Sequence, residues 1–233
     1  YGMNAGLADA ANLAWHLAAQ FEAWAAPQAL CAYEKERHPI TEQVSRFAMN
    51  HAHAMSKRRR EIPENLEEDT PQGAQARATF GKDLYDLNVQ QYCCAGLNFG
   101  YFYDQSPVIL YDDEAAPDYS MGSFVPSTVP GCRAPHFWLA DGQSVYDALG
   151  PAYTLFCFKQ AVSSDVLALQ SQAHALKMPL TVLDVSDVSD LPLEYKHALV
   201  LVRSDAHTVW RGNSLTSQTA HAVVAKLCGR VLT

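Results

Sequence analysis

Residues 2–15 read GMNAGLADAANLAW, in which a short stretch with glycine and asparagine leads directly into alanine-rich sequence. Apolar side chains recur at helical spacing farther along, which predicts a helix over residues 5–24. Gly2, Met3 and Asn4 then form the turn at its N-terminus. A helix N-terminus presents unpaired N–H groups and a partial positive charge, so this end suits an electron-rich group. A plain turn that caps an alanine-rich helix would have the same spacing, and spacing alone does not separate the two.

Further helices are expected over most of the next 70 residues. Pro27 suits the first turn of a second helix, and Pro39 is expected to interrupt it. An apolar stripe over residues 40–55 predicts a third helix. Residues 62–73, acidic and with two prolines, are expected to form an exposed loop before a helix at about residues 74–92.

The pattern then changes to alternation. Residues 97–103 and 108–111 are predicted to be strands, and residues 112–135 have the proline-rich composition of a connector. We place a domain boundary in this connector. Residues 1–128 are then a helix-rich part with its connector, and residues 129–233 are a second domain.

The second domain has the element order strand–helix–strand followed by strand–strand–helix. This order is typical of a thioredoxin-like layer, so the predicted fold class is α/β, with a mixed sheet covered by helices. A further short strand at residues 136–139 and a tight turn at Asp141-Gly142 are expected to precede it. The predicted elements are strands 153–158, 180–185, 198–203 and 208–211, a helix 164–177 with Val166, Leu167, Leu169, Ala173 and Leu176 inward, and a helix 216–228 with Thr216 as N-cap.

Composition excludes several classes of partner. The net charge of −8 argues against nucleic acid, because phosphate binding needs clustered basic residues. The single basic run, residues 57–60, is followed at once by acidic residues and is interpreted as a solvated helix end. No apolar stretch reaches the roughly 20 residues that span a bilayer, so no membrane contact is expected. Six cysteines without C-x-x-C spacing indicate reduced thiols in a cytoplasmic protein.

The first residues also bear on the extent of the protein. The sequence has no initiator methionine and runs at once from Tyr1 into the turn and helix described above. We therefore expect this chain to be part of a longer polypeptide.

Four segments together resemble FAD-dependent aromatic-ring hydroxylases of the phenol hydroxylase and p-hydroxybenzoate hydroxylase type. Residues 2–15 match the family pattern G-M-N-x-G-x-x-D-A-x-N-L-A-W, and residues 33–39 (YEKERHP) match Y-E-x-E-R-x-P. Residues 130–136 (PGCRAPH) resemble the P-G-x-R-A-P-H that opens the C-terminal domain of the phenol hydroxylase subgroup. Residues 202–212 resemble the family's final hairpin. The matches cover nearly the whole chain in the expected order.

The resemblance implies a flavin-dependent monooxygenase that hydroxylates a phenolic substrate with FAD, O₂ and either NADPH or NADH. It implies that Gly2, Met3 and Asn4 bind the cofactor, with the N–H groups of Met3 and Asn4 near the flavin N1 and C2 carbonyl. Glycine lets backbone and ring approach closely. The resemblance assigns no catalytic residue in this chain.

What the sequence lacks limits that interpretation. The G-x-G-x-x-G fingerprint and the family's DG and GD motifs are absent, so the ADP part of FAD and most of the substrate pocket belong to a missing N-terminal half. The chain alone is expected to be inactive. The resemblance also implies a C-terminal domain that serves packing or oligomerisation, and a homodimer is expected.

Other candidate sites have plainer explanations. His51 and His53 are two residues apart on a predicted helix, so their rings point apart and no metal site is predicted. Tyr101, Phe102 and Tyr103 could line an aromatic pocket, but core or subunit packing is the expected role. A packing or hydrogen-bonding role is expected for His136 at the domain junction.

Two alternatives of different class remain open. The first is a non-catalytic dimerisation or interaction module with a degenerate thioredoxin fold. The second is a thiol oxidoreductase, which the sequence disfavours because no C-x-x-C follows the strand at residues 153–158 and no proline directly precedes residue 198. Cys157 lies within the predicted strand and is expected to be buried.

Overall fold

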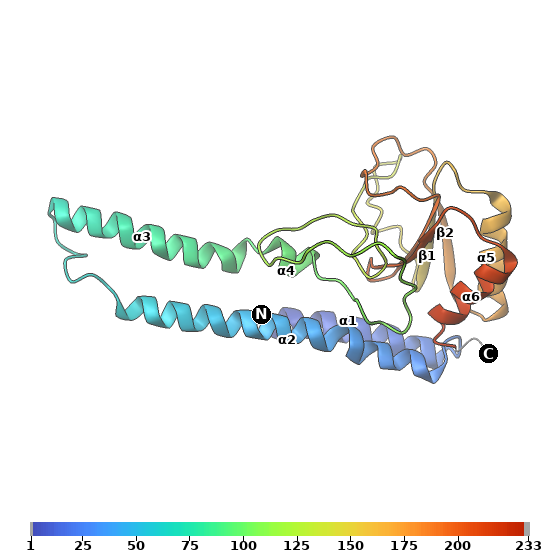
Figure 1. Cartoon of the computed structure of the whole chain (residues 1–233), viewed down its shortest axis with the longest axis horizontal. Helices are drawn as coiled ribbons and strands as arrows, with labels where there is room; N and C mark the ends of the chain where they lie inside the picture. The colour runs from blue at the N-terminus through green and yellow to red at the C-terminus, as the bar shows by residue number, and fades with distance from the viewer. Residues whose placement is uncertain (1, 231–233) are drawn as a thin grey trace.

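The computed structural model describes residues 2–230, the side chain of Gln90 excepted. Helices α1 and α2 lie side by side, and a small sheet with helices α5 and α6 stands at one end of them (Figure 1). Much of α2 and α3 extends away from the sheet as a two-helix arm (Figure 1). Within residues 2–230 no helix is both long and apolar enough to cross a bilayer.

The first helices confirm one prediction and correct another. Helix α1 spans Gly2–Phe21, a 3-10 turn spans Pro27–Leu30, and α2 runs without a break over Cys31–Arg60. The predicted interruption at Pro39 is wrong. A proline inside a helix costs about 3 kcal/mol. Its neighbours Glu36, Arg37 and Ile40 are buried, and we attribute the continuity of α2 to their tertiary contacts.

The arm is closed by a mostly exposed loop, as predicted. Helix α3 spans Pro71–Tyr92 and begins three residues earlier than expected, because Pro71 occupies its first turn and the Thr70 hydroxyl accepts a hydrogen bond from the Gly73 N–H at 3.0 Å. The basic end of α2 is solvated, and Arg58 pairs there with Glu61 and with Asp83 of α3.

The strands predicted at residues 97–103 and 108–111 are wrong. A short helix, α4 (Ala95–Phe99), occupies the start of the first segment, and neither segment forms a strand. Single hydrogen bonds tie them to their neighbours, from the Tyr103 N–H to the Gly131 carbonyl (3.0 Å) and from the Leu110 N–H to the Val209 carbonyl (2.9 Å). The alternation in the sequence does not correspond to alternate burial, since Leu97 and Tyr103 are buried but Phe99 between them is 48% exposed.

The C-terminal domain confirms the predicted element order. Strands β1 (Tyr153–Cys157), β2 (Leu180–Asp184), β3 (Leu199–Arg203) and β4 (Thr208–Gly212) form one sheet in the order β2-β1-β3-β4. Strand β1 is parallel to β2 and antiparallel to β3, which is antiparallel to β4. The mixed sheet has the thioredoxin-like arrangement expected for an α/β domain.

Two helices accompany this sheet. Helix α5 spans Ser163–Ala175 and α6 spans Ser217–Leu227, and Thr216 caps α6 as predicted. Leu169 and Ala173 of α5 face the core, but Leu167 is 64% exposed, which corrects the prediction that it points inward. The predicted strand at residues 136–139 is reduced to one isolated bridge, between Trp138 and Ser144. The tight turn follows it, with Gly142 in the left-handed region at φ 83°.

The two faces of the sheet carry separate cores. Phe156 and Val200 pack on one face against Phe137 and Tyr195, which lie in loops. On the other face, residues of β1, β3, α5 and α6 share one cluster with Ala19, Trp24 and Ala32. The helix-rich part and the sheet therefore share an apolar core. The division at residues 128 and 129 stays a prediction.

Candidate functional site

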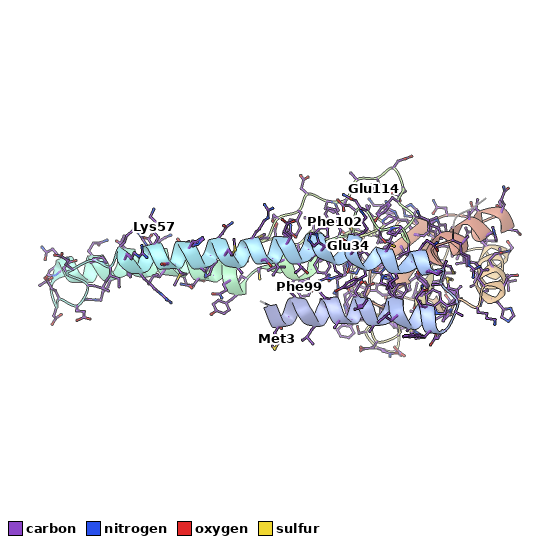
Figure 2. The ribbon with its side chains drawn as sticks, turned by 90° about the horizontal axis from the view of Figure 1, so that it is seen from below. Met3, Glu34, Lys57, Phe99, Phe102 and Glu114 are labelled. Carbon is purple, nitrogen blue, oxygen red and sulfur yellow. The ribbon has the colours of Figure 1, made fainter. Side chains whose placement is uncertain are left out.

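The N-terminal end of α1 is exposed and carries none of the acidic residues that would neutralise a helix N-terminus. Helix α1 begins at Gly2, so Met3 and Asn4 lie in its first turn rather than in a turn before it. Their N–H groups are among those for which a helix has no internal acceptor. Figure 2 shows Met3 at the end of α1 that lies away from the sheet, and its side chain is 79% exposed. No atom lies within 4 Å of a Cβ placed on Gly2 or Gly6.

A cavity of about 330 Å³ opens beside the first two turns of α1. Asn4, Ala5 and Ala8 form its α1 side, and Ile40 and Val44 of α2 lie across from them. The remaining walls come from the end of α3, from α4 and from Tyr101, with Arg37 as the one ionised side chain that lines it. Its size lies in the range of small-molecule sites, and its lining combines apolar with polar side chains.

Arg37 is held in place by groups on both sides. Its Nε donates to Asp9 Oδ1 at 2.9 Å, and the Thr41 hydroxyl donates to the same oxygen at 3.2 Å. Its Nη1 also lies 3.4 Å from the Tyr103 hydroxyl, and its guanidinium lies over the Tyr101 ring. The sequence motifs of residues 2–15 and 33–39 are thus joined by a partly buried ion pair beside the cavity.

A second, deeper ion pair joins the helices to the sheet. Arg203 Nη1 and Nη2 donate to Glu36 Oε1 and Oε2 at 2.9 and 2.8 Å, and both side chains are completely buried or nearly so. Asn12 Nδ2 donates to Glu36 Oε2 at 2.8 Å, and the Ser106 hydroxyl donates to Oε1 at 2.6 Å. Arg203 also pairs with Asp205.

The electrostatics of this cluster favour the ionised carboxylate. Burial alone would raise the pKa of Glu36, but the charge and hydrogen bonds of Arg203, with His16 Nε2 3.8 Å from the carboxylate, outweigh it. The pKa of Glu36 is therefore held well below its ordinary value. For His16, burial is the largest effect and lowers the pKa, so the ring is neutral.

Sequence reasoning missed this cluster, although both partners lie within motifs that carry the resemblance. Glu36 belongs to the segment YEKERHP and Arg203 to the final hairpin segment. A charged residue inside an otherwise apolar strand, as at Arg203, is the one local signal that could have indicated a buried partner. The partner itself is 167 positions away, and no spacing rule connects the two.

The remaining candidates divide between packing and cavity. Tyr103 is buried and stacks on His207 with ring centroids 4.3 Å apart, whereas Tyr101 lines the cavity. His136 has the expected hydrogen-bonding role, with Nε2 2.9 Å from the Ser144 hydroxyl oxygen. No group of three or more potential metal ligands occurs within residues 2–230.

The cysteines do not form a redox site. All six are free thiols. Cys157 is buried in β1 as predicted, and burial raises the pKa of its thiol to about 11. Little of the Cys157 thiol is therefore present as the nucleophilic thiolate at neutral pH, which argues against thiol catalysis by this residue.

The sequence of this chain is similar to those of known flavin-dependent proteins. Residues 1–48 match the family model described as an FAD binding domain. The FAD-dependent monooxygenase apdD of Emericella nidulans is 30% identical over 240 residues, which cover 98% of this chain and 38% of that protein. Phenol 2-monooxygenase of a Pseudomonas species is 27% identical over 266 residues, which cover 98% of this chain and 42% of that protein.

A solved structure resembles the fold of this chain over nearly its whole length. The structure of RebC with bound 7-carboxy-K252c aligns at a TM-score of 0.86 and 31% identity, covering 99% of this chain and 43% of RebC. RebC has also been solved with reduced flavin.

The fold and these matches define a class, the C-terminal part of FAD-dependent monooxygenases. This chain is similar to that part over nearly its whole length, which confirms the resemblance predicted from the sequence and FAD as the cofactor of the class. The chain spans about two fifths of the length of the relatives named above.

Proposed function

We propose that this chain is the C-terminal part of an FAD-dependent monooxygenase that hydroxylates a phenolic substrate with O₂ and either NADPH or NADH. One observation carries the proposal. The N-terminus of α1 is exposed, has no acidic residue in its first turn, and lies beside a cavity of about 330 Å³. The helix N-terminus suits an electron-rich planar group, and the cavity beside it suits an apolar ring.

The first residues of α1 fit the flavin. Gly2, Met3 and Asn4 would hold its pyrimidine edge, because the amides of Met3 and Asn4 have no acceptor within the helix and open space adjoins Gly2 and Gly6. Bound FAD supplies the oxygen-activating redox chemistry. The positive end of α1 would stabilise negative charge on the N1 and C2 carbonyl edge of a bound, reduced flavin.

The cavity walls would receive the aromatic substrate. Ile40, Val44 and Leu97 exclude water from one side of a ring, and Tyr101 offers an aromatic edge. Arg37, fixed by Asp9, is placed to orient a phenolate oxygen or a polar ring substituent. The other side of the substrate and the ADP part of FAD would be bound by the N-terminal half of the protein.

The chain by itself would neither hold FAD tightly nor turn over, since it lacks the phosphate-binding fingerprint. The thioredoxin-like domain would serve packing in a homodimer of the complete enzyme, since it has no C-x-x-C and its Cys157 is buried.

Purification of the full-length protein tests the function directly. We expect yellow protein with a flavin absorption spectrum, and NADPH or NADH oxidation that a phenolic compound accelerates with formation of a hydroxylated product. Colourless protein that binds no added FAD would contradict the proposal and favour a non-catalytic interaction module. Flavin reduction that no member of a phenol panel stimulates would contradict the substrate class alone.

A further inference from the structure

The N-terminal part of α1 is joined to α2 by polar contacts at two of its residues. Asp9 pairs with Arg37 at 2.9 Å, and Asn12, one helical turn later, donates to Glu36 at 2.8 Å. Asn12 is 5% exposed, so its hydrogen bond lies inside the protein. These two contacts are directional, and they fix the same face of α1 against α2 at two successive turns.

Arg203 extends these contacts to the sheet. Its guanidinium grips Glu36 through two parallel hydrogen bonds and lies over the Trp15 ring of α1, 4.9 Å from the ring centre. Trp15 follows Asn12 by one turn. The C-terminal domain therefore contacts α1 directly, where Arg203 and Tyr153 meet Trp15, and indirectly, through Glu36 and Asn12.

A buried ion pair is an expensive way to join two elements. Desolvation costs several kcal/mol per ion, and a pair of well-packed apolar residues is often as stable. An apolar pair, however, provides no directional acceptor for Asn12. Buried polar groups are known to fix register where apolar packing leaves it free. The arrangement here has the form of such a register device.

The register of α1 matters at its other end. Met3 precedes Asn12 by nine residues, which is roughly 13 Å along a helix. A helix moves as a rigid rod over that length, so a slip at Asn12 moves the amides of the first turn by the same amount. A displacement of about 1 Å is enough to change the efficiency of a preorganised site.

We propose that Arg203, acting through Glu36 and Asn12, is a positioning residue for the flavin-facing end of α1, so that the thioredoxin-like domain sets the affinity and reduction potential of the flavin. This inference rests on the proposed function. Arg203 touches neither cofactor nor substrate, and its effect is transmitted through α1.

The test uses the full-length protein with FAD and four variants, of which Arg203→Lys is the conservative one. Asn12→Leu removes the hydrogen bond to Glu36 at similar volume. The double variant Glu36→Leu/Arg203→Met replaces the ion pair by apolar side chains. It provides a second test of the same register device if Asn12→Leu does not fold. Glu42→Gln is the control, because it breaks the exposed Arg46–Glu42 pair on the same helix.

Three quantities are measured for each variant: the FAD dissociation constant, the midpoint potential of the flavin, and the melting temperature. For Asn12→Leu and for the double variant we expect FAD to bind about tenfold more weakly and the flavin midpoint potential to be more negative. A tenfold change in the dissociation constant corresponds to the loss of about one hydrogen bond. Glu42→Gln should match the wild type. Arg203→Lys retains the positive charge but cannot donate two parallel hydrogen bonds to Glu36. Its FAD dissociation constant and midpoint potential should lie between those of the wild type and the double variant.

The outcomes separate this inference from the proposed function. Wild-type protein that binds no FAD would contradict the proposed function. Variants that melt earlier but keep the wild-type dissociation constant and midpoint potential would overturn the positioning role, because the pair would then contribute stability alone.

Discussion

Glu36 of α2 and Arg203 of β3 stand 167 positions apart in the sequence and meet as a fully buried, two-pronged ion pair. Ser106, from the irregular segment between them in the sequence, and Asn12 of α1 each donate a further hydrogen bond to the same carboxylate. Four separate regions of the chain thus depend on one charged group. Their stabilities should be coupled, and removal of a single partner should be felt throughout the protein.

Loss of Arg203 alone is expected to be severe. Arg203→Met leaves Glu36 as a buried charge without its partner and should lower the free energy of unfolding by about 3–5 kcal/mol. The double variant Glu36→Leu/Arg203→Met should recover most of that loss, because the fully buried carboxylate is removed with its partner and only Asp205, whose side chain is 29% exposed, loses an ion pair. Urea unfolding of the full-length protein measures both values, and a double variant no more stable than the single one would contradict the explanation.

The stability should fall in acid as Glu36 becomes protonated. Its pKa in the folded protein is lower than the ordinary value of 4.5, so the unfolded chain binds the proton more tightly. The contribution of Glu36 is therefore fully present above about pH 4.5 and is lost as the pH falls toward the folded-state pKa. The urea midpoint between pH 6 and pH 3 measures the effect, and the double variant that lacks Glu36 should show a shallower decline.

Substitution at Met3 tests the flavin contact without a change in the cavity. Met3→Pro removes one N–H donor at a helix position where proline is tolerated, whereas Met3→Ala keeps the donor and removes the side chain. We expect a more negative flavin midpoint potential for the proline variant and a value near that of the wild type for the alanine variant. Equal potentials in both variants would show that this amide does not stabilise the reduced flavin.

Alanine substitution at two helical glycines should change the stability of the protein in opposite directions. A Cβ on Gly96 of α4 would overlap the backbone carbonyl of Ser120, so Gly96→Ala should destabilise the protein by about 2 kcal/mol or more. Gly81 of α3 has no neighbouring atom within 4 Å, and Gly81→Ala should stabilise it by up to about 1 kcal/mol. Calorimetry on the matched pair checks the packing of α4.

Cys157 should resist modification in the folded protein. It is 8% exposed and burial raises the pKa of its thiol to about 11, whereas Cys31 and Cys93 are exposed. Iodoacetamide at pH 7.5, followed by peptide mass spectrometry, should label the two exposed cysteines first. Fast labelling of Cys157 would reopen the thiol-oxidoreductase interpretation.

The sequence by itself determined the local elements whose signals are short in range. Strand–helix alternation after Tyr153, the N-cap at Thr216 and the helix that follows Gly2 all appear where periodicity and capping chemistry predict them. These signals suffice because each depends on neighbours a few residues away. The four motifs that carry the resemblance also belong to this level.

Only the tertiary structure decided the rest. Helix α2 continues through Pro39, and the alternating aromatic segment after Cys94 becomes a short helix and an irregular segment. The Asp9–Arg37 and Glu36–Arg203 pairs and the cavity beside Asn4 arise only when segments far apart in the sequence meet. A pattern of a few residues cannot encode the identity of a partner 167 positions away, because burial and charge pairing are properties of the assembled core.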